Sequence, residues 1–344
     1  MHSQEVIERQ NRILEIIVSS YVDSAMPVGS RQVSKIIGLS SATVRNVMSD
    51  LEEMGYITHP HTSAGRIPTD KGYRRYIESL MRVREVNKQK ARRIEEEYHL
   101  KRKGIESIIK KTAGLLSAIT HHTGVVLFPE VRRSTFKRIE LIATGKKRVL
   151  VILITVSGVV KNFMLDTKED LRADLEAISI LLNGDHYGLS LEDIKERLIG
   201  QIRRERDSSR VVLQEASDLL DAVLDIYQSE ELYLEGASHL LSQPEFESPE
   251  NAKSIMRFFE DKEFLVDLME KDIQADGIRI YIGKENTSPF MQNCTLVTSG
   301  YRVKDEFVGR LGIIGPTRMA YRDLIPMIDY IAETVTRELS DLVE

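Results

Sequence analysis

The sequence contains one cysteine, Cys294, among its 344 residues. A single cysteine cannot form an intrachain disulfide or a CxxC metal knuckle, which excludes a disulfide-stapled secreted fold. Long hydrophobic runs are also absent, since the longest aliphatic stretch, residues 149–156, is far too short to cross a bilayer. The N-terminal residues are too charged for a signal peptide. We therefore expect a cytoplasmic protein.

Common enzyme motifs are missing as well. The sequence has no GxSxG nucleophile elbow, no HExxH zinc motif and no GxGxxG nucleotide loop. Residues 277–284 resemble a phosphate loop only superficially, because Glu285 stands where Ser or Thr is required. His59 and His61 have no cysteine or carboxylate near them in sequence, which favours a solvated surface over a metal site. We expect no catalytic residues, no cofactor and no metal.

Charge is unevenly distributed along the chain. Residues 1–111 hold 20 Lys and Arg against 14 Asp and Glu, whereas the remainder holds 28 against 39. Residues 166–250 are the most acidic region, with 21 acidic and 8 basic side chains, so this region will not lie on DNA. A basic end on an acidic body favours contact between that end and phosphate.

The N-terminal eighty residues have the pattern of a winged helix-turn-helix. Apolar residues at helical spacing predict a helix over 6–22, a second helix capped by Ser30, and a third over 41–54 capped by Ser40 or Ser41. The turn between the second and third helices is short enough for a helix-turn-helix.

A predicted wing follows the third helix. Two short strands, 56–58 and 66–68, flank a loop that contains proline and glycine, and Thr69 can cap a further helix. An arginine such as Arg66 beside a glycine-bearing wing tip suits a minor groove or a backbone phosphate.

The outer face of the third helix is the candidate reading surface. Its buried stripe leaves Arg45 and Asn46 outside, and these side chains can pair with guanine and adenine. Hydroxyl groups near a helix start suit phosphate. A solvated helix face is the alternative, but the adjoining turn and wing favour DNA. The predicted DNA-binding residues are Ser40, Ser41, Thr43, Arg45, Asn46 and Ser49 in the third helix; His59, His61, Thr62, Ser63, Arg66, Lys71 and Arg74 in the wing and following helix; and Ser30 and Arg31 at the start of the second helix.

The rest of the chain predicts an α+β body. Residues 82–111 are charged and helix-prone, which predicts a connecting helix, and 167–250 are mostly helical. Strand patterns occur on both sides of that helical segment, so we expect one sheet domain that carries an inserted helical domain. The start and the end of the insert stay open, and the strands at 136–165 fit either domain. The predicted strands are 124–128, 136–143, 149–156, 159–165, 278–282, 295–301 and 307–314, and a final helix spans about 320–343.

Residues 26–77 closely resemble the heat-inducible transcription repressors called HrcA. The segments PVGSR, SSATVRN, LEEMGYI and PHTSAGRIPTDKGYR occur in the family's order with almost no gaps. The resemblance implies an α+β multidomain fold with a GAF-like α/β sheet domain. Its expected parts are a winged helix-turn-helix at 1–85, a connecting helix and the first part of the GAF-like domain at 86–165, an inserted acidic, mainly helical dimerisation domain at 166–250, and the second part of the GAF-like domain at 251–344.

The resemblance also implies a function. Such proteins are bacterial stress-response repressors of chaperone operons that bind an inverted-repeat operator (CIRCE) as homodimers. The GroEL chaperonin keeps them active, and heat stress releases them from DNA. Two alternatives stay open: a metabolite-responsive repressor with a ligand-binding GAF-like domain, and an enzyme or phosphate-binding module joined to a DNA-tethering domain.

Overall fold

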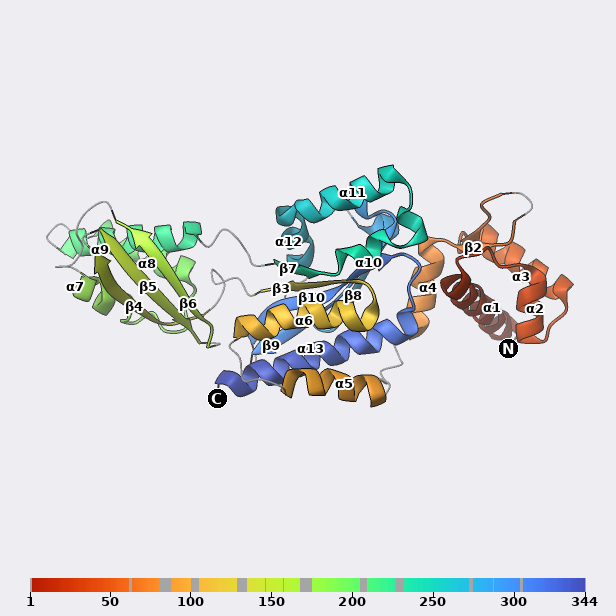
Figure 1. Ribbon diagram of the computed structural model, residues 1–344, viewed down its shortest axis with the longest axis horizontal. Coiled ribbons are helices and arrows are strands. Elements are labelled where there is room, and N and C mark those ends of the chain that lie inside the picture. Colours follow the sequence, from red (N-terminus) through yellow and green to blue (C-terminus); the bar gives the residue numbers. More distant parts are fainter. Residues whose placement is uncertain are drawn as a thin grey trace.

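The computed structural model contains three bodies arranged in a row (Figure 1). A winged helix lies at one end, a five-stranded sheet with its helices lies in the middle, and a three-stranded sheet with three helices lies at the other end. The multidomain α+β class and the N-terminal winged helix are confirmed. The structure describes residues 2–61, 64–80, 88–99, 105–128, 135–145, 147–156, 158–167, 175–204, 209–226, 232–271, 275–286, 288–303 and 306–343.

The N-terminal body follows the predicted order of helices and strands. Its elements are α1 (His2–Ser24), α2 (Ser30–Ile37), α3 (Ser41–Glu53), β1 (Ile57–Thr58), β2 (Ile67–Pro68) and α4 (Asp70–Leu80). One cap differs from the prediction. Gly29, in extended conformation, precedes α2, and no side chain caps that helix, so Ser30 is its first residue and not its cap.

The central sheet has the strand order β7-β3-β10-β9-β8, and every neighbouring pair is antiparallel. Successive residues of β3 point to opposite faces, as expected for a strand. Val126 joins the core on one face, and Val125 and Leu127 join the core on the other. The strands are β3 (Thr123–Leu127), β7 (Leu232–Glu235), β8 (Ile278–Ile282), β9 (Cys294–Val303) and β10 (Glu306–Pro316).

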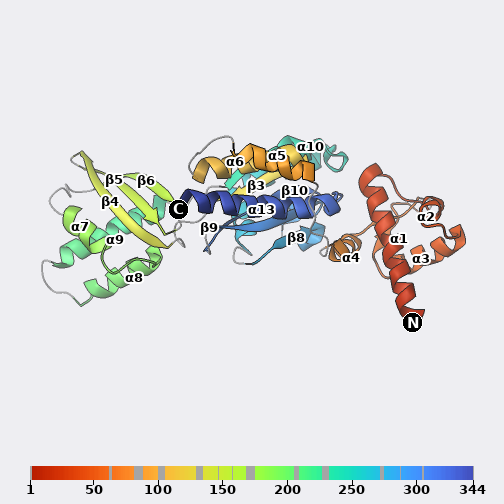
Figure 2. The same ribbon diagram turned by 90° about the horizontal axis from the view of Figure 1, so that it is seen from below.

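Helices cover both faces of this sheet. On one face α13 runs along the strands with α5 and α6 beside it (Figure 2), and on the other lie α10, α11 and α12. These helices are α5 (Lys88–His99), α6 (Ile105–Thr120), α10 (Ala237–Leu241), α11 (Pro249–Glu260), α12 (Lys262–Glu270) and α13 (Tyr321–Val343). No helix in the described part of the chain is both long and apolar enough to cross a bilayer.

The predicted connecting helix is two helices, α5 and α6, that pack side by side. The Tyr98 hydroxyl lies 2.7 Å from Thr112 Oγ1, and Lys111 Nζ lies 3.2 Å from Glu97. In one straight helix, residues 14 apart would be separated by about 21 Å. Residues 88–99 and 105–120 therefore do not form one straight helix, and the prediction of a single connecting helix is wrong.

The third body differs from the expected domain division. Among the residues that the structure describes, its strands β4, β5 and β6 pair only with one another, and their buried face packs on α7, α8 and α9 in a separate core. The strands at 136–165 therefore belong with the insert and do not extend the central sheet. Residues 232–270 instead form β7 and the helices of the central sheet. The elements are β4 (Phe136–Gly145), β5 (Arg148–Thr155), β6 (Val160–Asp166), α7 (Leu175–Leu182), α8 (Leu191–Ile202) and α9 (Ser209–Ile226).

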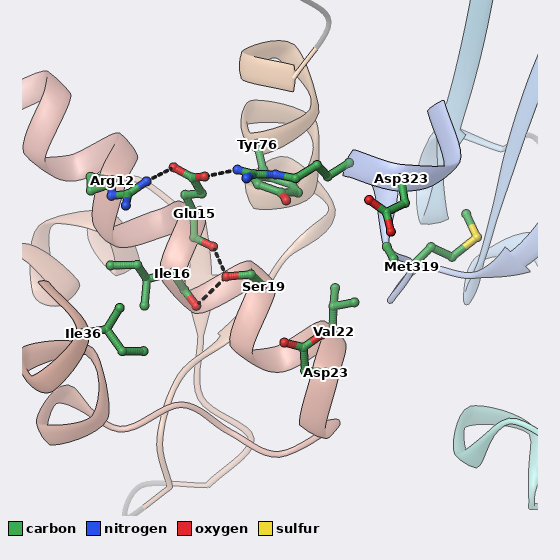
Figure 3. A pocket seen from close by; sticks show the side chains of 12 residues that line it. Arg12, Glu15, Ile16, Ser19, Val22, Asp23, Ile36, Tyr76, Met319 and Asp323 are labelled. Atoms are coloured by element: carbon green, nitrogen blue, oxygen red, sulfur yellow. Dashed lines mark hydrogen bonds and ion pairs between the residues drawn. The ribbon is translucent and has the colours of Figure 1, made fainter. Parts of the chain in front are cut away.

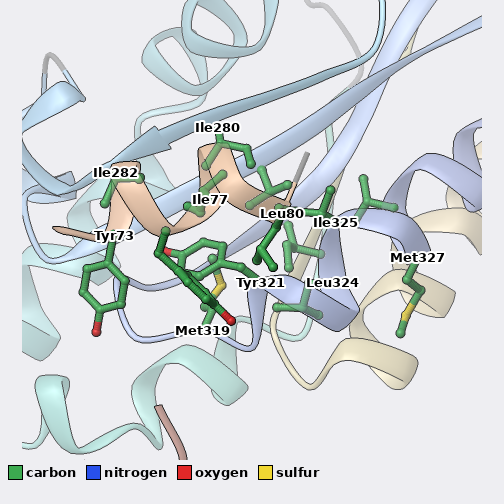
Figure 4. Close-up of a cluster of buried hydrophobic side chains, with 14 of the residues drawn as sticks. Tyr73, Ile77, Leu80, Ile280, Ile282, Met319, Tyr321, Leu324, Ile325 and Met327 are labelled. Carbon is green, nitrogen blue, oxygen red and sulfur yellow. The ribbon is translucent and has the colours of Figure 1, made fainter. Parts of the chain in front are cut away.

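Helix α4 joins the winged helix to the central body through one continuous hydrophobic core. Tyr73 and Ile77 of α4 are buried against Tyr321 and neighbouring apolar side chains of the central body (Figure 4). Polar contacts surround this core: Arg74 Nε donates to Glu285 Oε1 at 2.9 Å, and the Lys284 amide donates to Asp70 at 3.1 Å. The winged helix and the central body thus share a core.

Candidate nucleic-acid interface

Helix α3 is positioned by local signals that the sequence carries. Gly38 ends α2 with φ of 75°, a left-handed conformation that glycine adopts without steric cost. Ser40 then caps α3, accepting a hydrogen bond from the Thr43 amide at 3.1 Å. A buried stripe fixes the rotation of the helix about its axis, and its members are Val44, Val47, Met48 and Leu51.

The opposite face of α3 is exposed, as predicted from the stripe. Arg45, Asn46 and Ser49 are exposed, and no hydrogen bond or ion pair joins their side chains to another residue that the structure describes. Ser41 and Thr43 are half-buried, and the Thr43 hydroxyl lies 2.8 Å from that of Ser40. Arg45 and Asn46 therefore remain available for hydrogen bonds to base edges.

The wing is a short hairpin anchored to the start of α2. Ile57 pairs with Pro68 and Thr58 with Ile67, and the Arg66 backbone exchanges hydrogen bonds of 2.9 and 2.8 Å with Val28. Close packing requires a glycine here. A Cβ on Gly65 would lie 2.7 Å from the backbone of Pro27 and Val28.

One carboxylate, that of Glu52 on α3, ties down both arms of the wing. His59 Nδ1 donates to Glu52 Oε1 at 2.5 Å, and Arg66 Nε donates to Glu52 Oε2 at 2.8 Å. Partial burial alone would raise the pKa of Glu52, but the His59 hydrogen bond and the Arg66 charge outweigh it and hold this pKa below its ordinary value. Sequence reasoning gave Glu52 no role, because its two partners lie 7 and 14 residues away.

Two predicted DNA-binding residues on α4 have partners inside the protein. Lys71 Nζ donates to the Met54 carbonyl at 2.8 Å, at the C-terminal end of α3, where a cation is favourable. The Arg74 guanidinium is bound by Glu285 and by the Ile280 carbonyl of the central body. Arg74 therefore lies at the junction between the two bodies, and its predicted contact with DNA stays a prediction.

The remaining predicted residues lie around α3. Arg31 at the start of α2 and His61 in the wing are exposed, and Ser30 is half-buried. Thr62 and Ser63 lie outside the described residues. In the described part of the chain, no group of three or more His, Cys, Asp or Glu side chains could hold a metal ion.

A groove of about 360 Å³ lies between α1 and the start of α13 (Figure 3). Glu15 stands between Arg12 and Arg322 on its wall and forms an ion pair with each. The Ser19 hydroxyl donates to the Glu15 carbonyl at 2.8 Å. Because Glu15 pairs with both arginines, we interpret the groove as part of the junction between the winged helix and the central body.

A helix-turn-helix with a free polar face, followed by a two-stranded wing, defines a winged-helix DNA-binding protein. Two family models identify the family of winged-helix proteins to which the chain belongs. The model described as "Winged helix-turn-helix transcription repressor, HrcA DNA-binding" matches residues 5–80, and "HrcA protein C terminal domain" matches residues 106–325. The chain belongs to the HrcA family of heat-inducible transcription repressors, and it is therefore a DNA-binding regulator and not an enzyme.

Full-length relatives support the same family. The heat-inducible transcription repressor HrcA of Geobacter sulfurreducens is 39% identical, over 97% of this chain and 98% of the relative. That of Pelotomaculum thermopropionicum is 37% identical, over 98% and 97%. A crystal structure described as that of a hypothetical protein has a similar fold, with a TM-score of 0.64 at 24% identity over 97% of this chain and 98% of the other.

Proposed function

We propose that the N-terminal half of α3 enters the DNA major groove. Arg45 and Asn46 would read base edges, while Ser41 and the free amides at the helix start would meet phosphate. The observation that carries this proposal is that Arg45 and Asn46 are exposed opposite a buried stripe and have no partner among the residues that the structure describes. Asp50 and Glu53 on the C-terminal half are exposed and acidic, which favours an approach led by the N-terminal half.

The test is a binding titration with Arg45→Ala. Loss of a bidentate arginine contact should weaken operator binding by about 1–3 kcal/mol and relax base choice at one position. Arg203→Ala is the matched control, because Arg203 is an exposed arginine in the insert and its removal changes the net charge equally. Equal operator affinity and selectivity in Arg45→Ala and wild type would refute the placement of α3.

We infer that the insert, between β3 and β7, makes a homodimer through the uncovered face of its sheet. This face carries apolar side chains from all three strands: Ile142 is 47% exposed, Met164 51% and Val160 59%. The half-buried Leu150 and Ile152 of β5 lie between them. An exposed apolar patch bordered by charge suits association, and Arg148 pairs with Asp166 at its edge. A second copy supplies the same apolar face, and a two-fold dimer suits an inverted repeat.

Charge insertion tests this interface. Met164→Glu should shift the protein towards monomer in sedimentation, because it places a carboxylate in the apolar patch. Ile180→Glu is the matched control, since Ile180 is 68% exposed on α7, on the helical side of the same body. A dimer that withstands Met164→Glu but not Ile180→Glu would place the interface on the helices.

The biological role we propose is repression of heat-shock chaperone operons at the inverted-repeat CIRCE operator. Family resemblance supports the operator, and it also supports GroEL as the partner that maintains the active form. Heat inactivation needs no dedicated sensor, because a fold stable by only a few kcal/mol loses its folded population on warming. A DNA-bound repressor of this kind would work in the bacterial cytoplasm, associated with the nucleoid.

The alternative of a metabolite-responsive repressor has less support. We propose a GAF-like relationship for the central domain, but among the described residues both faces of its sheet are covered by packed aliphatic and aromatic side chains. A small molecule that raises the melting temperature and changes operator affinity would favour this alternative.

A further inference from the structure

The wing is too short to hold itself in place. Its two strands contribute two residue pairs, and a hairpin of that size is marginal in water. Additional ties must therefore fix where the wing residues point. Glu52 supplies two of them, one to each strand arm, through His59 and Arg66.

We propose that Glu52 is a positioning residue for operator reading: it orients Arg66 and His59 of the wing relative to the reading face of α3. The inference rests on the proposed function, in which α3 and the wing contact DNA together. Arg66 is held at both ends, since its backbone bonds to Val28 and its guanidinium to Glu52. A guanidinium has five N–H donors, so those that Glu52 and the Ala64 carbonyl leave unused can still enter a minor groove, whose width depends on sequence.

Geometry places Glu52 apart from the other acids of α3. Glu52 is half-buried, whereas Asp50 and Glu53 are exposed, and no ion pair joins either of these to another described residue. A carboxylate near DNA without internal partners would only repel phosphate. The pairs with Arg66 and His59 offset that repulsion and turn the same charge into a constraint on the wing.

These two roles predict opposite effects of removing the charge. If Glu52 only repelled DNA, Glu52→Gln would strengthen binding to every duplex. If it positions the wing, Glu52→Gln weakens operator binding while binding to a scrambled duplex stays level or rises, so the ratio of the two affinities falls. A merely structural role would change the unfolding temperature without changing that ratio at temperatures well below unfolding.

The experiment compares wild type, Glu52→Gln and the control Glu53→Gln on an inverted-repeat operator duplex and a scrambled duplex. We expect Glu52→Gln to lower the operator-to-scrambled ratio by about tenfold, the effect of one lost charge-assisted hydrogen bond. Glu53→Gln, with the same change in net charge, should leave the ratio within about twofold. Hydroxyl-radical footprints should lose protection where the wing meets the minor groove and keep it where α3 lies.

Two further variants test whether Glu52 acts through its charge and through Arg66. Glu52→Asp keeps the charge and should recover part of the ratio. In Arg66→Gln, adding Glu52→Gln should cost little more, because the wing has already lost its main tie. An unchanged ratio in Glu52→Gln, or equal losses in Glu52→Gln and Glu53→Gln, would overturn the inference. Wild type that fails to prefer the operator would instead refute the proposed function.

Discussion

Two tyrosines at the junction of the winged helix and the central body predict opposite responses to the same substitution. Tyr73 and Tyr321 are 2% and 0% exposed, and their ring centroids lie 5.9 Å apart. The Tyr321 hydroxyl donates to the Thr317 carbonyl at 2.7 Å and lies 2.8 Å from Thr295 Oγ1. The Tyr73 hydroxyl is buried and has no hydrogen-bond partner among the described residues. Burial raises the pKa of both phenols, so both are neutral in the folded protein.

The magnitudes follow from the hydroxyl groups alone, because Tyr→Phe keeps the ring. Tyr73→Phe removes an unsatisfied buried hydroxyl and should raise the free energy of unfolding by about 1 kcal/mol. Tyr321→Phe removes a satisfied hydroxyl and leaves its partners unpaired, which should lower it by about 1–3 kcal/mol. For a body of this size, each kcal/mol corresponds to about 2–4 °C in Tm.

Calorimetry on the two single variants and the double variant tests this reasoning. We expect Tm to rise in Tyr73→Phe and to fall in Tyr321→Phe. The temperature at which operator binding is lost should shift in the same direction as Tm in each variant. A fall of similar size in both variants would show that packing of the phenol oxygen, and not hydrogen bonding, controls this core.

Three further predictions test the junction, the packing of the winged helix and a buried histidine. Arg74→Ala should cost about 0.5–1 kcal/mol of stability, because the Arg74–Glu285 pair is about one-third exposed, and it should leave the salt dependence of operator binding unchanged; a lower salt slope would return Arg74 to the DNA surface. Gly72→Ala should destabilise the winged helix by about 1–3 kcal/mol in denaturant titrations, since its Cβ would lie 2.0 Å from the Tyr56 carbonyl oxygen. Burial and the charges of His121, His239 and Arg318 lower the pKa of His122 to about 4, below its ordinary value of 6.5, so the folded protein resists a proton that the unfolded chain accepts. The stabilisation from neutral His122 is therefore fully present above pH 6.5, and the free energy of unfolding falls by about 1.4 kcal/mol per pH unit as pH falls towards 4. His122→Gln should flatten this pH dependence in unfolding titrations.

The helix-turn-helix was predictable because its signals are local. Gly38 and Ser40 act on backbone groups within four residues of themselves, and the stripe of α3 repeats every three or four positions. Such signals depend little on the remainder of the fold, so the sequence alone located the exposed face that carries Arg45 and Asn46.

The strand runs were also predictable, but sheet membership was not. Residues 149–154 are apolar throughout, which is typical of a strand covered on both faces, as β3 is. In β5 only alternate residues are fully buried, and the other face has no helix on it in the described structure. The apolar residues on the exposed face of β5 therefore make its sheet hard to assign from the sequence. They agree with the proposal that a second copy of the chain covers this face.

The cations of the N-terminal body show most clearly what sequence cannot supply. In the linear chain Arg45, Arg66 and Arg74 are equivalent basic residues in or beside a predicted DNA-binding element. Folding distinguishes them: Arg66 meets Glu52 14 residues away, and Arg74 meets Glu285 211 residues away. A count of basic side chains therefore overstates the charge that faces DNA. Among the described residues of this body, the exposed cations without an internal partner are Arg9 on α1, Arg31 and Lys35 on α2, and Arg45 on α3. If α3 meets DNA as proposed, the acidic partners in the fold help to set the direction of approach, because each cation that they pair with contributes less to the field at the phosphates.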